Sequence, residues 1–258
     1  MNTHHSKEVE PAVTRCDHCE CQKRSFEAFT MAFQPIWNCR TQSVFGYEAL
    51  VRGLNNEPAY QILSQVNQEN KYAFDQQCRA KAIKLAAKLG MKEMLSINFL
   101  PNAVYEPERC LATTLKLANK YDFPTSQIMF EFTEVERIED TEHVRNIVEY
   151  YHRLGFKTAI DDFGAGYSGL NLLADFQTNI AKLDMGLIRG IDQSHSRQTI
   201  VRNMVVMLNE LQITPLAEGV ETLQEYQFLH SIGVELIQGY LIAKPGFESL
   251  PEVTIPPL

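Results

Sequence analysis

The sequence predicts an α/β fold, a TIM-like (β/α)8 barrel in which about eight strands close into one sheet. Short apolar, strand-like runs alternate with helical segments along most of the chain, which indicates βαβ units and a parallel sheet. Counting an opening hairpin, the strands number about eight, which fits a closed barrel better than an open doubly wound sheet. The glycine pattern of a dinucleotide-binding Rossmann turn is missing, and 258 residues suit a barrel domain, which runs to roughly 250 residues.

The folded domain is expected to begin with an antiparallel hairpin. Residues 1–28 are polar and show no sustained periodicity, so they are predicted to form an N-terminal tail before a domain at residues 29–258. Two strand-like runs follow, Met31–Trp37 and Val44–Arg52, with a short polar turn between them. Adjacent strands joined by such a turn are typical of an antiparallel hairpin.

Helices and short strands then alternate to the end of the domain. Gly90 and Gly155 each follow a helical segment in the position of a C-terminal glycine, and Thr222 with Glu225 forms a capping box. The predicted helices are Phe74–Leu89, Glu108–Tyr121, Thr141–Leu154, a short one from about Ser168, Ser196–Leu211 and one from Thr222. The predicted strands are Leu95–Phe99, Ile128–Phe132, Lys157–Asp161, Asn179–Leu183, Ile213–Ala217 and Glu235–Ile237.

The charge balance argues against two kinds of partner. The chain has 24 Lys and Arg against 32 Asp and Glu, a net charge of −8. A broad surface for a nucleic-acid polymer or an anionic membrane depends on an excess of Lys and Arg, so neither partner is expected. No stretch approaches the roughly 18 apolar residues of a membrane span, and the polar start lacks the apolar core of a secretory signal. We therefore expect no membrane span and a cytoplasmic protein.

Three of the six cysteines lie in the predicted tail. Cys16, Cys19 and Cys21 are close in sequence, with His18 between the first two. Thiolates and an imidazole at such spacing suit Zn²⁺ or a thiol switch. No second ligand pair follows at zinc-finger spacing, so a tail without a site is the favoured interpretation and a Zn²⁺ site is the alternative.

Polar side chains stand at or just beyond the ends of the predicted strands, where catalytic groups project in barrels of this class. In chain order they are Glu48 and Arg52, Asn98, Glu131 and Glu134, Asp161 and Asp162, Lys182 and Asp184, Glu218 and Glu221, and Gln238. Asn98, Glu131 and Lys182 each lie between two apolar residues, so they face the opposite side of the strand from their neighbours. A single strand-end carboxylate could cap a helix or lie in solvent. That interpretation does not extend to all these strands together, because burying several uncompensated carboxylates is costly.

This set of side chains predicts a metal-dependent reaction on a phosphoester. Carboxylates with an amide and no nearby His or Cys cluster favour the oxygen-preferring cations Mg²⁺ or Mn²⁺ over Zn²⁺. Two such ions about 4 Å apart can clamp a phosphodiester and activate a water for in-line attack. Lys182 can orient that water, act as a base or stabilise charge, and Arg52 suits a phosphate oxygen. These residues leave the identity of the phosphoester open.

The motifs also carry a family resemblance. They are Gln34–Ile36, Glu48–Leu50, Asn98, Glu131–Glu134, Asp161–Ser168, Lys182–Asp184, Glu218–Glu221 and Gln238–Tyr240. In this order, over residues Met31 to Pro245, they resemble the EAL-domain cyclic di-GMP (c-di-GMP) phosphodiesterases. The resemblance implies a TIM-like (β/α)8 barrel with an antiparallel first strand, which agrees with the opening hairpin. It also implies hydrolysis of c-di-GMP to linear pGpG with two Mg²⁺ or Mn²⁺ ions, a reaction that lowers the level of this second messenger.

By the same resemblance, five residues correspond to metal ligands. Glu48, Asn98, Glu131 and Asp161 correspond to the ligands of one ion. Asp161 and Asp162 correspond to the pair that is shared with, or binds, the second ion.

The remaining motif residues correspond to catalytic and substrate-contact positions. Besides Glu48, the catalytic residues are Lys182, which handles the attacking water, and Glu218, which supports the metal-bound waters. Glu134 corresponds to the anchor of the loop Asp162–Gly169. The expected substrate contacts are Gln34, Arg52, Asp184 and Gln238.

The chain departs from the family pattern at few positions. Ala165 stands where many members have Thr, and Gly169 where many have Ser, which removes a hydroxyl and bears on regulation more than on chemistry. Catalytically silent members lose metal ligands or the glutamate of the EAL motif, and none is lost here. We therefore predict an active enzyme, and a homodimer because dimers are common in the family. The alternatives are a silent receptor or protein-binding module, and an unrelated barrel enzyme acting on another phosphoester.

Overall fold

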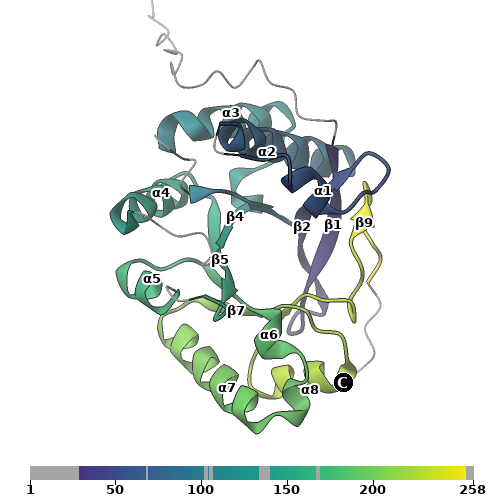
Figure 1. The fold of residues 1–258 in the computed structure, drawn as a ribbon, viewed down its shortest axis with the longest axis vertical. Helices are drawn as coiled ribbons and strands as arrows, with labels where there is room; N and C mark the ends of the chain where they lie inside the picture. The colour runs from purple at the N-terminus through teal and green to yellow at the C-terminus, as the bar shows by residue number, and fades with distance from the viewer. Residues whose placement is uncertain are drawn as a thin grey trace, which may run out of the picture.

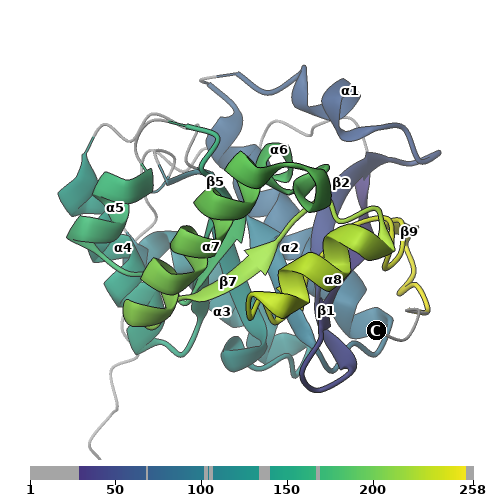
Figure 2. The same ribbon diagram turned by 90° about the horizontal axis from the view of Figure 1, so that it is seen from below.

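The computed structural model describes residues 29–67, 69–101, 104, 107–133, 140–166 and 169–253. The predicted tail with Cys16, Cys19 and Cys21 lies outside these residues, as does Glu134. Figure 1 looks along a ring of strands that is surrounded by helices, and Figure 2 shows the same arrangement from the side.

The strands form one closed sheet, which confirms the predicted barrel and its antiparallel first strand. Strand β1 (Phe29–Asn38) pairs antiparallel with β2 (Ser43–Gly53) on one side and with β8 (Leu236–Ile237) on the other, and so closes the ring. The strands from β2 to β8 pair in sequence order and in parallel. The intervening strands are β3 (Met94–Asn98), β4 (Ile128–Thr133), β5 (Lys157–Phe163), β6 (Ile180–Leu183) and β7 (Thr214–Ala217). A short strand, β9 (Gly246–Phe247), pairs antiparallel with β1 at Ala32 and Phe33.

Helices cover the outside of the barrel (Figure 1). They are α1 (Ala59–Leu63), α2 (Lys71–Lys88), α3 (Pro107–Lys120), α4 (Thr141–Arg153), α5 (Gly169–Asp175), α6 (Met185–Ile188), α7 (His195–Glu210) and α8 (Leu223–Ser231), with single 3-10 turns at Thr125–Gln127 and Ile191–Gln193. The capping box predicted for the last helix is present at Thr222 and Glu225. Within the described ranges, no helix combines the length and the apolar character that crossing a membrane would require.

An apolar layer fills the barrel beneath the polar strand ends. Its residues are Ile36, Met129, Ala159, Ile180, Leu216 and Leu236, with Phe45 and Met94 packed against them. Because side chains alternate along a strand, the residue two positions further toward the carboxyl end faces inward as well. Along β4, β5 and β6 these second residues are Glu131, Asp161 and Lys182, and directly after the ends of β7 and β8 they are Glu218 and Gln238. β1 runs in the opposite direction. Its inward residue in the polar layer, next to Ile36 of the apolar layer, is therefore Gln34, two positions earlier in the chain. The alternation therefore places one polar layer directly above the apolar one.

Candidate metal centre

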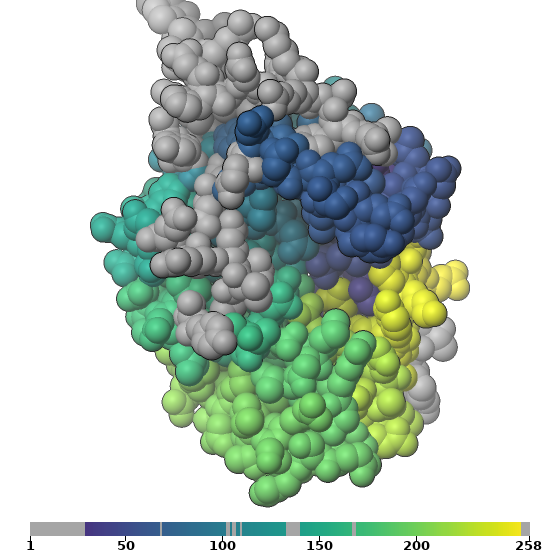
Figure 3. All heavy atoms as spheres, viewed as in Figure 1, coloured from purple at the N-terminus to yellow at the C-terminus, as the bar shows by residue number. Residues whose placement is uncertain are grey.

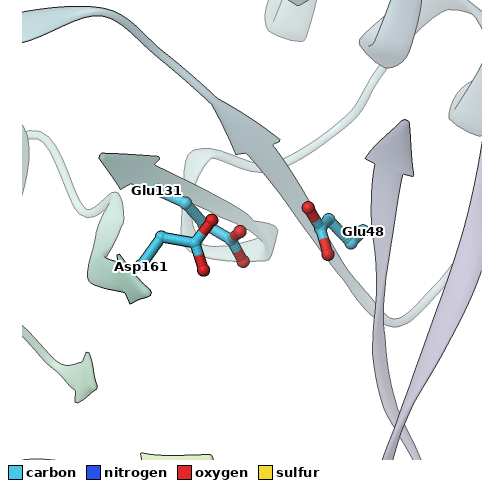
Figure 4. Close-up of side chains that lie close together, drawn as sticks. All are labelled: Glu48, Glu131 and Asp161. Carbon is cyan, nitrogen blue, oxygen red and sulfur yellow. The ribbon is translucent and has the colours of Figure 1, made fainter. Parts of the chain in front are cut away.

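Three carboxylates converge in the polar layer of the barrel. Glu48 on β2, Glu131 on β4 and Asp161 on β5 each offer an oxygen, and these oxygens lie within 4.8 Å of one another. Figure 4 shows Glu131 and Asp161 side by side, with their carboxylates turned toward Glu48 across the barrel. In Figure 3 the surface at the end of the barrel that carries the polar layer is hollowed between the dark blue segment around α1 and the green and yellow segments opposite.

Lys182 lies at the centre of the cluster and contacts four carboxylates. Its Nζ is 2.7 Å from Glu131, 2.9 Å from Asp161, 2.9 Å from Glu218 and 3.4 Å from Glu48. Lys182 and Glu131 are fully buried, at 0% exposure. Four ionised carboxylates beside one ammonium would leave three uncompensated negative charges among these five groups. Such an excess is unstable out of water unless protons or cations balance it.

The backbone of β5 brings two successive aspartates to the same site. Side chains of adjacent residues in a regular strand point to opposite faces. Asp162 instead adopts a left-handed backbone with φ of 53°, and the pairing of β5 with β6 is irregular between Ile160 and Phe163. As a result Asp161, Asp162 and Glu218 form a second group of oxygens within 4.8 Å, and Asp161 belongs to both groups.

Three amides surround Glu48. Asn98 Nδ2 donates to Glu48 Oε1 at 2.9 Å, and Gln238 Nε2 donates to Glu48 Oε2 at 2.8 Å. Gln34 is the β1 residue directly opposite Glu48 in the β1–β2 register, and its Oε1 lies 3.4 Å from Gln238 Nε2. These contacts fix the direction in which the Glu48 carboxylate points.

Ser96 is a site residue that the sequence did not single out. It is fully buried on β3, and its hydroxyl donates a short hydrogen bond to Glu131 Oε1. The signal was present in the strand period, because Ser96 precedes Asn98 by two positions and therefore shares its inward face.

Burial, together with the crowding of charges, shifts the pKa values of three groups. Burial raises the pKa of the Glu131 carboxyl to about 8, with Lys182 opposing and the neighbouring carboxylates adding to the shift. Burial also raises the pKa of Glu218 well above its usual value, against the opposing effect of Lys182. Burial lowers the pKa of the Lys182 ammonium, but the carboxylates around it, Asp161 first, outweigh this effect and hold the pKa well above its usual value.

Two of the residues predicted to contact substrate lie beside the cluster rather than within it. Arg52 follows Glu48 by four residues on β2, so it shares the same face, and its Nη1 donates to the carbonyl of Val51 at 2.7 Å. Asp184 caps the N-terminus of α6 by accepting from the Gly186 N–H at 2.9 Å. Its carboxylate belongs to neither oxygen group found among the described residues. The predicted loop anchor, Glu134, lies outside the described residues.

The residues present fit divalent cations. Both groups consist of carboxylates, with the Asn98 amide adjacent, and such oxygen ligands suit Mg²⁺, Mn²⁺ or Ca²⁺. Among the described residues, Asp161 Oδ1 is buried and accepts no hydrogen bond, although it contacts Lys182 as an ion pair. Gln238 Oε1 is also buried without a described donor. A buried oxygen without a donor, such as Gln238 Oε1, is expected where an ion or an ordered water binds.

Comparison with known proteins shows extensive similarity to one family. The sequence model described as "EAL domain" matches residues 22–245. A standalone versatile EAL protein from Vibrio cholerae O395, solved in its c-di-GMP bound form, is 64% identical with a TM-score of 0.87, over 90% of this chain and 98% of that one. Klebsiella pneumoniae BlrP1, solved at pH 9.0 as a manganese and c-di-GMP complex, is 35% identical with a TM-score of 0.82, over 87% of this chain and 58% of that one.

Curated relatives share the domain over part of their length. The blue light- and temperature-regulated antirepressor BluF of Escherichia coli is 30% identical over 87% of this chain. The cyclic di-GMP phosphodiesterase PA2567 of Pseudomonas aeruginosa is 31% identical over 76% of this chain. The chain spans 56% of the length of the first protein and 30% of the second.

Proposed function

The chain belongs to the EAL domain family, and from this premise we propose that it hydrolyses c-di-GMP to linear pGpG with the help of two divalent cations, Mg²⁺ or Mn²⁺. One observation carries the proposal, namely the two oxygen groups that share Asp161 around the buried Lys182. Relatives named as c-di-GMP phosphodiesterases and solved structures with c-di-GMP support the choice of substrate.

The two oxygen groups supply the proposed cation ligands. Glu48, Glu131 and Asp161, with the adjacent Asn98, would hold one ion, and Asp161 with Asp162 would hold the other. When bound, the ions neutralise the charge of the phosphodiester and lower the pKa of a water so that it can attack phosphorus. The shared carboxylate keeps the two sites close together, as in-line displacement at one phosphorus requires.

The chain's own polar groups orient the reactants. Lys182 donates hydrogen bonds to the attacking water and stabilises the charge that develops on phosphorus oxygens. Glu218, across the same centre, accepts hydrogen bonds from waters at the second group. Arg52 offers a guanidinium fork to a phosphate oxygen. Gln34, Asp184 and Gln238 are the further proposed substrate contacts, and the side-chain amide oxygen of Gln238, Oε1, has no hydrogen-bond donor within the described part of the chain.

The proposal is tested by incubating the purified protein with c-di-GMP in Mg²⁺, Mn²⁺ or EDTA and separating the products by chromatography. We expect pGpG with either metal and intact c-di-GMP in EDTA. The variant Glu48→Gln should give no product, while Glu210→Gln, which alters an exposed carboxylate on α7, should cleave like the wild type. Intact substrate in both metals would overturn the proposal.

A receptor without turnover is the second candidate, because one relative is named an antirepressor rather than a hydrolase. Calorimetry, which measures binding, together with the chromatographic assay, which detects pGpG, distinguishes the two functions. Saturable binding of c-di-GMP without formation of pGpG would identify a receptor. Binding followed by metal-dependent cleavage would identify an enzyme. The homodimer and the cytoplasmic location stay predictions, and sedimentation analysis tests the first.

A further inference from the structure

A buried ion pair lies in the helical layer behind the metal centre. Asp75 and Arg79, one turn apart on α2, bring Oδ2 and Nη2 to 2.8 Å, with side chains only 2% and 1% exposed. Removing both charges from water is costly, and apolar residues of similar volume are often as stabilising as such a pair. Stability alone therefore does not explain why a charged pair occupies this buried position.

Asp75 holds the chain segment that follows β3. Its Oδ1 accepts a hydrogen bond from the Leu100 backbone N–H at 3.1 Å. Leu100 lies two residues after Asn98. Asn98 belongs to the proposed ligand set, and its side-chain amide donates to Glu48. The contact thus restrains the backbone just beyond a proposed ligand.

Arg79 connects the backs of two neighbouring strands. Its guanidinium carbon is 5.5 Å from the centre of the Phe99 ring and 5.0 Å from that of Phe130. Phe99 follows Asn98 and Phe130 precedes Glu131, so by strand alternation the rings face Arg79 while Asn98 and Glu131 face the metal centre.

Tyr151 holds the third side of the guanidinium. Arg79 Nη1 donates to Tyr151 Oη at 3.2 Å, and Tyr151 on α4 is fully buried. The cation is therefore fixed by a carboxylate, two aromatic rings and a hydroxyl. Charge-assisted hydrogen bonds and a planar guanidinium fix orientation, whereas apolar packing mainly fixes volume.

We infer that Asp75 and Arg79 are positioning residues for the metal centre, which fix the strand ends that carry Asn98 and Glu131. This inference rests on the proposed function, because it assumes that these two residues bind a cation. Residues that support metal ligands from behind typically change metal affinity about 10- to 100-fold when they are replaced.

The test replaces the pair with apolar side chains, Asp75→Leu with Arg79→Met, so that no lone charge stays buried. We expect a folded protein whose Mn²⁺ affinity, measured by calorimetry without substrate, falls at least about tenfold. Excess Mn²⁺ should restore the rate of c-di-GMP cleavage. The matched control, Leu229→Ala on α8, removes a fully buried side chain, so it should lower the melting temperature but leave Mn²⁺ affinity unchanged.

The outcomes separate the inference from the function on which it rests. Unchanged Mn²⁺ affinity in the folded double variant would overturn the inference and leave the proposed function intact. Absence of Mn²⁺ binding by the wild type would overturn both. If the double variant does not fold, Tyr151→Phe carries the test, since it removes only the hydroxyl that holds Arg79. We expect weakened Mn²⁺ binding, and wild-type affinity would contradict the inference.

Discussion

At the scale of single residues, the main feature of the site is the excess of negative charge around Lys182. Four carboxylates contact one buried ammonium, and burial raises the pKa of Glu131 to about 8. Under the proposed function, carboxylates that repel one another in the metal-free protein would become ligands of the bound cations. This arrangement therefore lowers the stability of the metal-free protein and raises its affinity for metal.

Removal of one carboxylate should separate stability from activity. In EDTA, Glu48→Gln should raise the free energy of unfolding by about 1 kcal/mol, because it reduces repulsion and the nearby amides can still be satisfied. The same variant should lose hydrolysis in Mn²⁺. Urea unfolding and the chromatographic assay give the two values. A less stable metal-free variant, or one with near-normal turnover, would contradict this account of Glu48.

Removal of the Lys182 ammonium should have the opposite effect on the stability of the metal-free protein. In EDTA, Lys182→Met leaves the buried carboxylates without a partner, so we expect a loss of about 3–5 kcal/mol in urea unfolding. With saturating Mn²⁺ the variant should still bind c-di-GMP but cleave it about 10²- to 10⁴-fold more slowly. Full activity would remove Lys182 from the role proposed for it.

At the scale of elements, the two-residue period of the strands made most of the barrel predictable. The predicted strands match β3 to β8 closely, and their inward polar residues line the candidate metal centre. The short helices α1 and α6 were not predicted, because four or five residues are too few to show a helical period. Helix α2 begins at Lys71 rather than the predicted Phe74, and β5 runs on to Phe163, beyond the predicted end at Asp161.

Two features of the site depend on tertiary structure and could not be predicted from the sequence. The left-handed backbone at Asp162 turns two adjacent aspartates to one site, and no local pattern signals it. Asp75 and Arg79 have the i,i+4 spacing of an ordinary surface pair, and only the packing of α2 against the barrel shows that they are buried.

Helix α4 carries a histidine that should make stability depend on pH. His152 Nε2 lies 2.8 Å from Thr158 Oγ1, and burial lowers the pKa of the imidazole in the folded protein. The Asn179 hydrogen bond and Glu149 oppose this shift, and Lys157 adds to it. The unfolded chain then binds more protons, so stability is lost as pH falls through about 6.5, the unperturbed value.

The variant His152→Gln isolates this effect. Between pH 7.5 and 5.5 its urea midpoint should fall less than that of the wild type. Equal decreases in the two proteins would show that His152 does not contribute to the pH dependence.

At the scale of the whole molecule, closure of the barrel is what creates the site. Gln238 and Glu48 are 190 residues apart, yet they are hydrogen-bonded because β1 pairs with both β2 and β8. The sequence could predict which strand ends carry polar groups. It could not give the distances among them, since these follow from the closed sheet and its register.

The central claim is that Asp161 joins two cation sites in one barrel, and Mn²⁺ stoichiometry by equilibrium dialysis tests it most directly. The wild type should bind two Mn²⁺ per chain, and Asp161→Asn should bind fewer, at least about tenfold more weakly, because it alters a ligand common to both sites. Binding of one ion or none by the wild type, or two ions at unchanged affinity by Asp161→Asn, would contradict the claim.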